Sequence, residues 1–120
     1  MPRVVHFELP ADQPERAAEF YRSVFGWEIM KWGPVNYWLI KTGPETEPGI
    51  DGAIAKREDR TGTVNTISVS SLDDCVKRIT AAGGELIGPK RAIPGIGYHV
   101  YCRDPEGNVI GVLQPDPGAA

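Results

Sequence analysis

Hydrophobic and polar residues alternate along VVHFEL, residues 4–9, near the start of the chain. A period of two predicts a β-strand that packs one face on a core. The face directed at the core would hold Val5, Phe7 and Leu9. His6 and Glu8 would share the opposite, polar face of the same strand.

A helix is predicted directly after this strand. Asp12 provides a carboxylate that can cap the helix N-terminus, Pro14 suits the first turn, and Gly26 favours termination. Between these limits, apolar residues recur at helical spacing, namely Ala17, Phe20, Tyr21 and Val24. This spacing predicts an amphipathic helix that covers one face of a sheet.

Three further strands are predicted in the first half of the chain. Residues 27–32 and 36–43 are rich in aromatic and β-branched side chains, and Gly33–Pro34 between them indicates a turn. A polar loop at residues 43–49 leads to residues 50–57, which predict a short strand. The order of the first half is therefore β-α-β-β-β.

The second half repeats this order. Residues 63–70 predict a strand, and Ser71 begins a second amphipathic helix that ends at Gly83–Gly84. Residues 89–97 are rich in glycine and proline and predict a loop. The other strands are predicted at residues 85–88, 98–103 and 108–115.

The two halves are related by an internal repeat. An offset of 58 residues places Leu9 on Ile67 and Ile54 on Val112. The apolar stripes of the two helices fit an offset of 59 slightly better, which leaves the register open by one residue. A repeat of this length indicates two similar structural modules in one chain.

Neither half is long enough to bury one face of a sheet alone. We therefore predict an α+β fold of two βαβββ modules, about residues 3–57 and 62–114, followed by a tail at residues 115–120. The modules would share one curved, eight-stranded mixed sheet. Its concave side would line a cup-shaped cavity, because such seams between modules favour small-molecule sites.

The composition excludes several classes of protein. The 120 residues are 41% hydrophobic and 24% charged, with a formal net charge of −3, so no basic excess indicates nucleic-acid binding. No apolar run approaches the ~20 residues that cross a bilayer, and the start lacks a signal-peptide pattern. Cys75 and Cys102 are isolated and are typical of reduced thiols in a cytoplasmic protein.

Three segments resemble the vicinal oxygen chelate superfamily, which contains glyoxalase I, bleomycin-resistance proteins and extradiol dioxygenases. They are residues 4–27, residues 71–89 and, most specifically, YCRDPEGNVIGVLQ at residues 101–114. The resemblance implies paired βαβββ modules (the glyoxalase-like fold), a cup-shaped cavity, a homodimer and, in many members, a divalent metal. The chain is most similar to the small glyoxalase-like branch of this superfamily.

The resemblance implies metal ligands at corresponding points of the two modules: a His or Gln on each first strand and a Glu on each last strand. His6 matches the first position and is the candidate metal ligand. The other three positions fall on Val64, Ala53 and Gly111, or, one residue along, on Asn65, Gly52 and Ile110. Because a cation needs several converging ligands, we predict an incomplete metal site and no cofactor.

The candidate site residues follow from strand parity. His6, Glu8 and Tyr101 are the candidate catalytic residues, since imidazole, carboxylate and phenol groups carry protons. The candidate substrate-binding residues are Trp38, Thr66, Ser68, His99 and Arg103. Two alternatives stay open: His6 and Glu8 as a structural pair, and the aromatic residues Trp32, Tyr37 and Trp38 as core rather than a stacking wall.

We therefore predict a glyoxalase-like protein that binds a small organic molecule, without nucleic-acid or membrane partners. One alternative is a metal-dependent lyase or dioxygenase, with ligands from a dimer mate or from Asp51 or Glu47. The other is a drug-sequestering protein of the bleomycin-resistance type, which would use Glu8, Trp32 and Trp38 to hold a cationic ligand.

Overall fold

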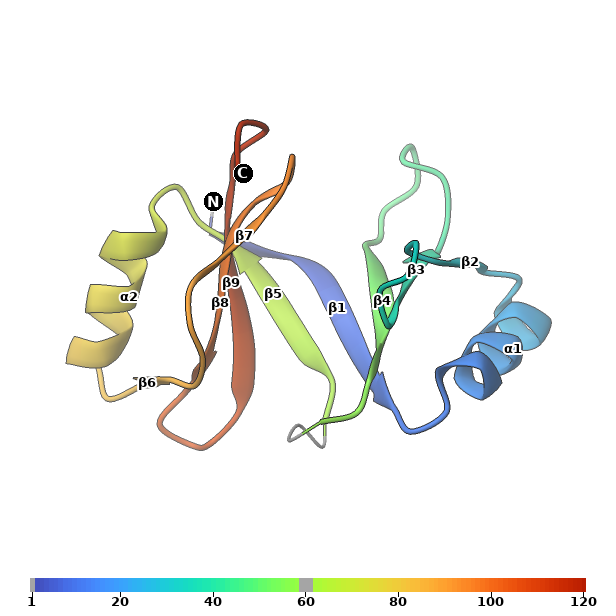
Figure 1. Ribbon diagram of the computed structural model, residues 1–120, viewed down its shortest axis with the longest axis horizontal. Helices are drawn as coiled ribbons and strands as arrows, with labels where there is room; N and C mark the ends of the chain where they lie inside the picture. The colour runs from blue at the N-terminus through green and yellow to red at the C-terminus, as the bar shows by residue number, and fades with distance from the viewer. Residues whose placement is uncertain (1, 59–61) are drawn as a thin grey trace. The chain divides into compact units, whose positions relative to one another are not determined.

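The computed structural model describes residues 2–58 and 62–120 (Figure 1). The described residues divide into two compact units, one within His6–Thr63 and the other formed by Val64–Ala120 with the first residues up to Val5. We call the helix and strands within residues 3–56 the first module, and the helix and strands within residues 64–115 the second module.

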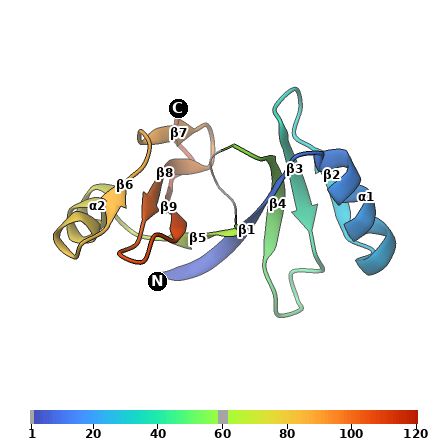
Figure 2. The ribbon, with the colours of Figure 1, turned by 90° about the horizontal axis from the view of Figure 1, so that it is seen from below.

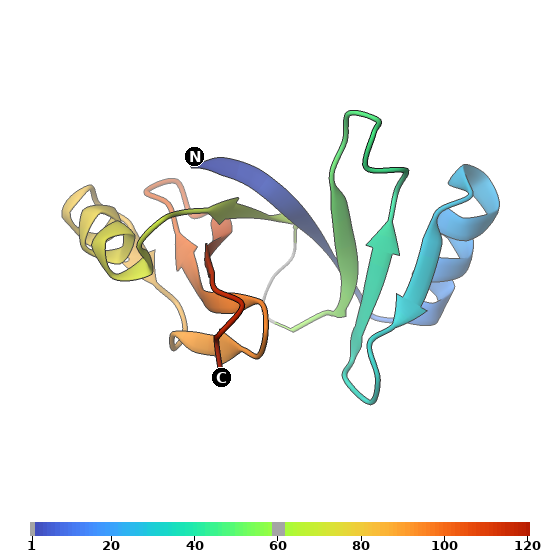
Figure 3. The ribbon, with the colours of Figure 1, turned by 90° about the horizontal axis from the view of Figure 1, so that it is seen from above.

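The first module is a mixed sheet with one helix. Its elements are β1 (Arg3–Ala11), α1 (Pro14–Phe25), β2 (Glu28–Lys31), β3 (Tyr37–Lys41) and β4 (Asp51–Lys56). The strand order is β2-β3-β4-β1, with β1 and β4 parallel and the other neighbours antiparallel. Helix α1, in blue, lies along one face of β2–β4 (Figure 3).

The core of the first module lies between α1 and this sheet. Phe7 and Leu9 pack against it, as the alternation in VVHFEL predicts, whereas Val5, predicted on the same core face, is 38% exposed. Ile54 is fully buried, and burying such a side chain stabilises the fold by about 1.5–3 kcal/mol. The buried members of this core are Ala11, Ala18, Ile29, Trp38, Ile40 and Ile54.

The start of α1 differs from the prediction. The helix begins at Pro14, so its N-cap is Gln13, whose side chain makes no capping hydrogen bond within the described residues. Asp12 lies one residue too early to cap the helix, and its carboxylate accepts a hydrogen bond from Arg57 Nε at 3.0 Å. The capping role predicted for Asp12 is therefore wrong. The end is as predicted, because Gly26 adopts φ 71°, where glycine is favoured.

The second module has the same plan with one extra strand. Its elements are β5 (Val64–Ser68), α2 (Leu72–Ala81), β6 (Glu85–Leu86), β7 (Arg91–Ile93), β8 (Gly97–Arg103) and β9 (Val109–Pro115). The strand order is β5-β9-β8-β6, and β7 also pairs with β8. Helix α2 lies beside β6 (Figure 2). The predicted α+β plan of two βαβββ modules is confirmed.

Helix α2 and its sheet enclose a second core. Ser71 caps the helix as predicted, because its Oγ accepts a hydrogen bond from the backbone N–H of Asp74 at 3.2 Å. Val100 and Cys102 of β8 point into this core, so His99 and Tyr101 occupy the opposite face, as strand parity predicts. The buried members are Val69, Leu72, Val100, Cys102 and Val112.

The loop predicted at residues 89–97 contains the short strand β7. It pairs antiparallel with β8, with Ile93 opposite Gly97. Gly95 has φ 76°, and Ile96 N–H donates to the carbonyl oxygen of Ile93 at 2.9 Å, which closes the turn. The glycines and prolines of this segment predicted the turn correctly, but they gave no indication of the strand at Arg91–Ile93.

The motif DPEGN at residues 104–108 is a structural turn. The Asp104 carboxylate accepts hydrogen bonds from the backbone N–H groups of Glu106 and Asn108 at 2.9 and 2.8 Å. Hydrogen bonding from Asn108 lowers the pKa of the Asp104 carboxyl below its usual value. The motif that most specifically carries the resemblance therefore shapes the β8–β9 hairpin.

The register of the strands fixes the internal repeat. In each module the first strand pairs in parallel with the last, with Glu8 opposite Ala53 and Thr66 opposite Gly111. The partners are 45 positions apart in both modules. The offset of 58 places Leu9 and Ile54 of the first core on Ile67 and Val112 of the second core, whereas an offset of 59 would exchange the core face with the polar face.

The tail after β9 is held by the β7–β8 turn. Asp116 N–H donates to the carbonyl oxygen of Ile96 at 2.9 Å, and Gly95 N–H donates to that of Ala119 at 3.0 Å. Neither helix of the described chain is long and apolar enough to span a bilayer.

Candidate functional site

The polar face of the first module carries three interacting side chains. His6 and Glu8 project from β1, and Tyr37 projects from the start of β3. The Tyr37 hydroxyl lies 2.8 Å from His6 Nε2 and donates a hydrogen bond to Glu8 Oε2 at 3.0 Å. We call these residues the His6–Tyr37–Glu8 relay. The two members on β1, which the sequence singled out, are thus linked by a residue about 30 positions away.

The hydrogen-bond pattern indicates which ring nitrogen of His6 carries a proton. A tyrosine hydroxyl has one proton, and a carboxylate only accepts hydrogen bonds. Because Tyr37 donates its proton to Glu8, its oxygen must accept a hydrogen bond from His6, which places a proton on Nε2. In neutral His6 the lone pair then lies on Nδ1, which is available as a base or hydrogen-bond acceptor.

The net effect of its surroundings on His6 favours the neutral imidazole. Burial lowers the pKa of His6 below its usual value of 6.5, while the nearby Glu8 and Asp51 carboxylates partly oppose this shift. Glu8 itself is only 5% exposed. A buried carboxylate needs hydrogen-bond donors, and the Tyr37 hydroxyl supplies one of them.

Aromatic rings border this face. The rings of His6 and Tyr37 are nearly parallel, with an interplanar angle of 14° and centroids 6.4 Å apart. Trp32, 40% exposed, packs against Tyr37 at a centroid distance of 6.1 Å. Of the aromatic residues considered as a stacking wall, Trp32 and Tyr37 therefore lie beside the relay.

Trp38 lies on the opposite face of β3. It is 6% exposed within the core under α1, and its Nε1 donates to Glu15 Oε1 at 2.6 Å. Of the two roles left open for Trp38, a stacking wall and the core, the structure therefore shows the core. The run YWLI has no polar alternation, so only the pairing of β3 with β4 assigns its faces.

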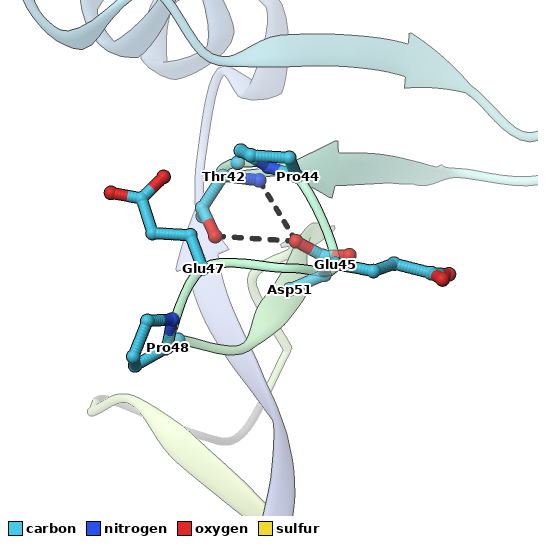
Figure 4. Close-up of a pocket in the computed structure, with 8 residues that line it drawn as sticks. Thr42, Pro44, Glu45, Glu47, Pro48 and Asp51 are labelled. Carbon is cyan, nitrogen blue, oxygen red and sulfur yellow. Dashed lines mark hydrogen bonds between the residues drawn. The ribbon is translucent and has the colours of Figure 1, made fainter.

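Asp51 joins the relay to the loop before β4. It lies opposite His6 in the β1–β4 register, and its Oδ1 accepts hydrogen bonds from Thr42 N–H at 2.9 Å and Thr42 Oγ1 at 3.2 Å (Figure 4). A hollow of about 420 Å³ lies within this loop. The side chains of Glu45 and Glu47 point in different directions rather than toward one ion (Figure 4).

A second hollow, of about 470 Å³, lies near the start of α1 and is lined by residues that include Arg16, Phe20 and Arg57. His6, Glu8 and Tyr37 line neither hollow.

The donor set does not fit the divalent metal that the resemblance implies. The offset of 58 places Val64 at the repeat position of His6, and the last-strand positions that the resemblance implies fall on Ala53 and Gly111. None of these three side chains can coordinate a cation. Among residues 2–58 and 62–120, no three His, Cys, Asp or Glu side chains gather as a metal site. As a candidate metal ligand, His6 therefore has no partner ligands among the described residues.

The polar face of the second module centres on Gly111. A Cβ atom at this position would lie 2.8 Å from His99 Nε2 and 2.9 Å from Thr66 Oγ1. Both side chains therefore occupy the space that a larger residue on β9 would need. His99, Thr66 and Ser68 are all buried polar residues, exposed by 5% or less.

Tyr101 and two arginines extend this second face along the β8 side. The Tyr101 ring meets His99 edge-on, with centroids 4.5 Å apart, and the Arg91 guanidinium lies over the same ring, with Cζ 5.5 Å from its centroid. Arg103, at the end of β8, forms an ion pair with Glu85 at 2.8 Å. The structure thus groups Tyr101 with His99, and ties Arg103 to an acidic neighbour.

The cysteines lie away from both polar faces. Cys75 and Cys102 are free thiols that pack in the core of the second module. Burial raises the pKa of the Cys102 thiol above its usual value, with a smaller contribution from Cys75. A buried thiol of this kind is a small apolar residue rather than a nucleophile.

The sequence alone missed two residues of these faces as site candidates. Tyr37 was grouped with its aromatic neighbours, and its parity with His6 depends on long-range pairing. Arg91 lies in the segment predicted as a loop. An alternation of Arg91 and Ile93 around a small residue was the only local signal for a strand there.

Curated proteins share sequence similarity with nearly the whole chain. A glyoxylase-like domain-containing protein of Didymella fabae is 31% identical over 113 residues, which cover 84% of each chain. CFP32 of Mycobacterium bovis is 29% identical over 119 residues, covering 92% of this chain, which spans only 43% of that relative's length. Metallothiol transferase FosB of Shouchella clausii is 26% identical over 111 residues, covering 89% of this chain and 76% of FosB.

Solved structures share the fold. Methylmalonyl-CoA epimerase in complex with methylmalonyl-CoA superposes with a TM-score of 0.71 at 14% identity, covering 100% of this chain and 99% of that chain. A superfamily member from Vibrio splendidus 12B01 gives a TM-score of 0.69 at 17% identity, covering 97% and 100%. At these identities the likeness establishes the glyoxalase-like fold alone.

The sequence profile of one superfamily matches residues 3–112, which is most of the chain. The matched region contains the first module, the second module as far as Val112 in β9, the His6–Tyr37–Glu8 relay and the DPEGN turn. The resemblance noted from the sequence is thereby confirmed. This chain belongs to the Glyoxalase/Bleomycin resistance protein/Dioxygenase superfamily.

Proposed function

We propose that this chain binds a small organic molecule on the polar face of its first module, through hydrogen bonds and acid–base side chains rather than a three-ligand metal site. The observation that carries the proposal is the Tyr37 hydroxyl, which lies 2.8 Å from His6 Nε2 and 3.0 Å from Glu8 Oε2. The three groups form a short chain of hydrogen bonds from a carboxylate to an imidazole.

Each member of the relay has a distinct proposed role. Glu8 orients the Tyr37 hydroxyl, Tyr37 holds the His6 ring, and His6 Nδ1 accepts a proton or hydrogen bond from the ligand. Burying a carboxylate is costly, and apolar residues would often serve a purely structural purpose as well. Several titratable groups on one sheet face are more typical of a binding or catalytic site.

The relatives support the class of ligand. The structural neighbour methylmalonyl-CoA epimerase is in complex with methylmalonyl-CoA, and the curated relative FosB is named a metallothiol transferase. Both names describe proteins that handle small organic molecules. The catalytic role predicted for Tyr101 and the substrate-binding roles predicted for Thr66, Ser68, His99 and Arg103 concern the second module and stay predictions.

Ligand-detected NMR of a library of neutral organic fragments tests the proposal. We expect hits that bind the wild-type protein and are lost in Tyr37→Phe and Glu8→Gln. Tyr98→Phe is the matched control, because Tyr98 packs on the core of the second module. Hits that bind Tyr37→Phe as well as wild type would contradict a role for the relay.

Metal analysis separates this function from a metal-dependent lyase or dioxygenase. We expect less than stoichiometric divalent metal in protein purified without chelator, because the register supplies His6 with no partner ligand. Stoichiometric Ni, Zn, Mn or Fe that disappears in His6→Ala would overturn the proposal.

Drug sequestration is the second candidate function. It is favoured by Trp32, which packs near Tyr37 on a face that also carries the Glu8 and Asp51 carboxylates. Aromatic rings beside carboxylates suit a cationic ligand. A thermal-shift measurement with the cationic glycopeptide bleomycin tests it, and the absence of any stabilisation would remove this candidate.

We also propose a cytoplasmic homodimer without nucleic-acid or membrane partners. Edge strand β2, with Met30 73% exposed, supports association between copies, and the free cysteines support a reducing compartment. Light scattering of the purified protein measures the oligomeric state. A monomer at all concentrations would contradict this part of the proposal.

A further inference from the structure

We propose that the second module carries a separate site for an organic carboxylate, bound by the Arg91 guanidinium on its Tyr101 platform. This site lies on the polar face formed by β7 and β8 and does not require the His6–Tyr37–Glu8 relay.

The strand register places the three side chains of this site on one face. Arg91 lies directly opposite His99 in the antiparallel β7–β8 pair, and directly opposite residues project to the same side of a sheet. Tyr101 follows His99 by two residues on β8, so it shares that face. The face opposite to it packs on the core through Val100 and Cys102.

The guanidinium of Arg91 is positioned by an aromatic ring. Its Cζ lies 5.5 Å from the centroid of Tyr101, and the Tyr101 ring is in turn fixed edge-on against His99 at 4.5 Å. His99 is only 5% exposed, so this stack is anchored in the folded sheet. A guanidinium that stacks on a ring still presents the N–H donors along its own edge. Two of these donors can bind the two oxygens of a carboxylate.

Arg91 differs from the basic residues around it. Lys90 pairs with Asp73 at 3.0 Å, and Arg103 pairs with Glu85 at 2.8 Å. Within the described parts of the chain, Arg91 forms no ion pair with a carboxylate. Arg91 is an exposed residue, so an anionic ligand can reach its charge.

The other polar groups of this face suit an anion with an organic body. Thr66 and Ser68 are hydroxyl residues, and His99 and Tyr101 present rings. The first module differs, because Glu8 and Asp51 lie close to His6 and would repel a carboxylate. A flat organic carboxylate is accordingly the class of ligand that the second face fits.

Titration with benzoate, followed by amide chemical shifts in NMR, tests the site. We expect saturable shifts at Arg91, His99 and Tyr101, and roughly tenfold weaker binding in Arg91→Gln, which is typical of losing a charge-assisted hydrogen bond. Benzamide, which has the same shape without the charge, should produce no saturable shift at these residues.

Matched variants make each outcome decisive. Arg78→Gln removes an exposed arginine from α2 of the same module and should leave benzoate binding unchanged. Tyr37→Phe should also leave it unchanged, so loss of the first-module site and loss of this one are distinguishable. Equal responses to benzoate and benzamide, or undiminished binding by a folded Arg91→Gln protein, would overturn the proposal.

Discussion

The two modules share one backbone register but carry different polar faces. Leu9 opposite Ile54 in the first module corresponds to Ile67 opposite Val112 in the second, and these apolar pairs belong to the two cores. On the other face, Glu8 corresponds to Thr66. The repeat thus preserves the side chains that pack and changes those that can do chemistry.

Strands β3 and β8, which each pair with the last strand of their module, show the same divergence. Tyr37 lies opposite Ala55 in the first module, and His99 lies opposite Leu113 at the corresponding place in the second. Tyr37 completes a relay with two acid–base groups, whereas His99 fills the space above Gly111. One scaffold therefore supports an acidic face and a cationic, aromatic face.

The largest expected effect on stability concerns Ala53 and Gly111, which occupy equivalent positions in the two modules. Gly111→Ala should destabilise the protein by about 1–3 kcal/mol, because the new Cβ would lie 2.8 Å from His99 Nε2 and 2.9 Å from Thr66 Oγ1. Urea unfolding of the variant against wild type measures the change in free energy of unfolding.

A double-mutant cycle sharpens this prediction. In a His99→Ala background the obstacle on β8 is removed, so the penalty of Gly111→Ala should shrink. The corresponding swap in the first module, Ala53→Gly, should cost only about 0.5–1 kcal/mol plus the lost burial of a methyl group. An identical penalty for Gly111→Ala in both backgrounds would show that His99 does not set the limit.

Tyr37→Phe tests the relay as a structural unit. The variant leaves the buried Glu8 carboxylate with one donor fewer, which should lower the free energy of unfolding by about 1–3 kcal/mol. Tyr98→Phe in the second module should change it by less than about 0.5 kcal/mol. Equal effects in the two tyrosine variants would contradict the asymmetry between the modules.

The helix N-termini offer a smaller contrast. Ser71 caps α2, so Ser71→Ala should destabilise the protein by about 1 kcal/mol, whereas Gln13→Ser should stabilise α1 by up to a similar amount. Thermal unfolding of both variants measures the two changes. If both variants lose stability, Gln13 holds the start of α1 in a way that a serine cap cannot replace.

The pH dependence of stability is the smallest expected effect. The pKa of His6 is lower in the folded protein than its usual 6.5, so the unfolded chain binds this proton more readily. The free energy of unfolding should therefore fall as pH decreases below about 6.5, and the loss is complete below the folded pKa.

The variant His6→Gln isolates the contribution of His6 protonation to this loss of stability. Glutamine keeps a donor for Tyr37 but cannot titrate, so the acid-side loss should be reduced when unfolding is measured between pH 8 and pH 5. Glu8, Asp51 and Tyr37 face His6 and stay in place in this variant. An unchanged pH profile would show that His6 does not carry the term.

Local sequence patterns predicted much of this comparison. The alternation in VVHFEL assigned Phe7 and Leu9 to the core and His6 and Glu8 to the polar face, and the structure confirms it. The repeat predicted two modules, and the order of their elements is confirmed. These features are local or periodic, so they are visible in the chain itself. The catalytic and binding roles of the candidate residues stay predictions.

The sequence-based predictions were wrong or incomplete where the local pattern carries no information about strand pairing or exact position. Trp38 lies in an apolar run without alternation, so its face is set by β4 rather than by its neighbours in sequence. Asp12 has the chemistry of a cap but lies one residue away from the N-cap position. Strand β7 depends on pairing with β8, which the glycines and prolines around it do not reveal.

The sequence by itself determined the duplicated βαβββ plan and the two apolar cores. Only the tertiary structure decided which polar side chains meet. Tyr37 reaches His6 and Glu8 across 31 and 29 positions, and Arg91 reaches Tyr101 from a neighbouring strand. The physical reason is that the period of apolar residues is a local property of the chain. Hydrogen bonds and ring contacts depend instead on strand pairing between distant segments.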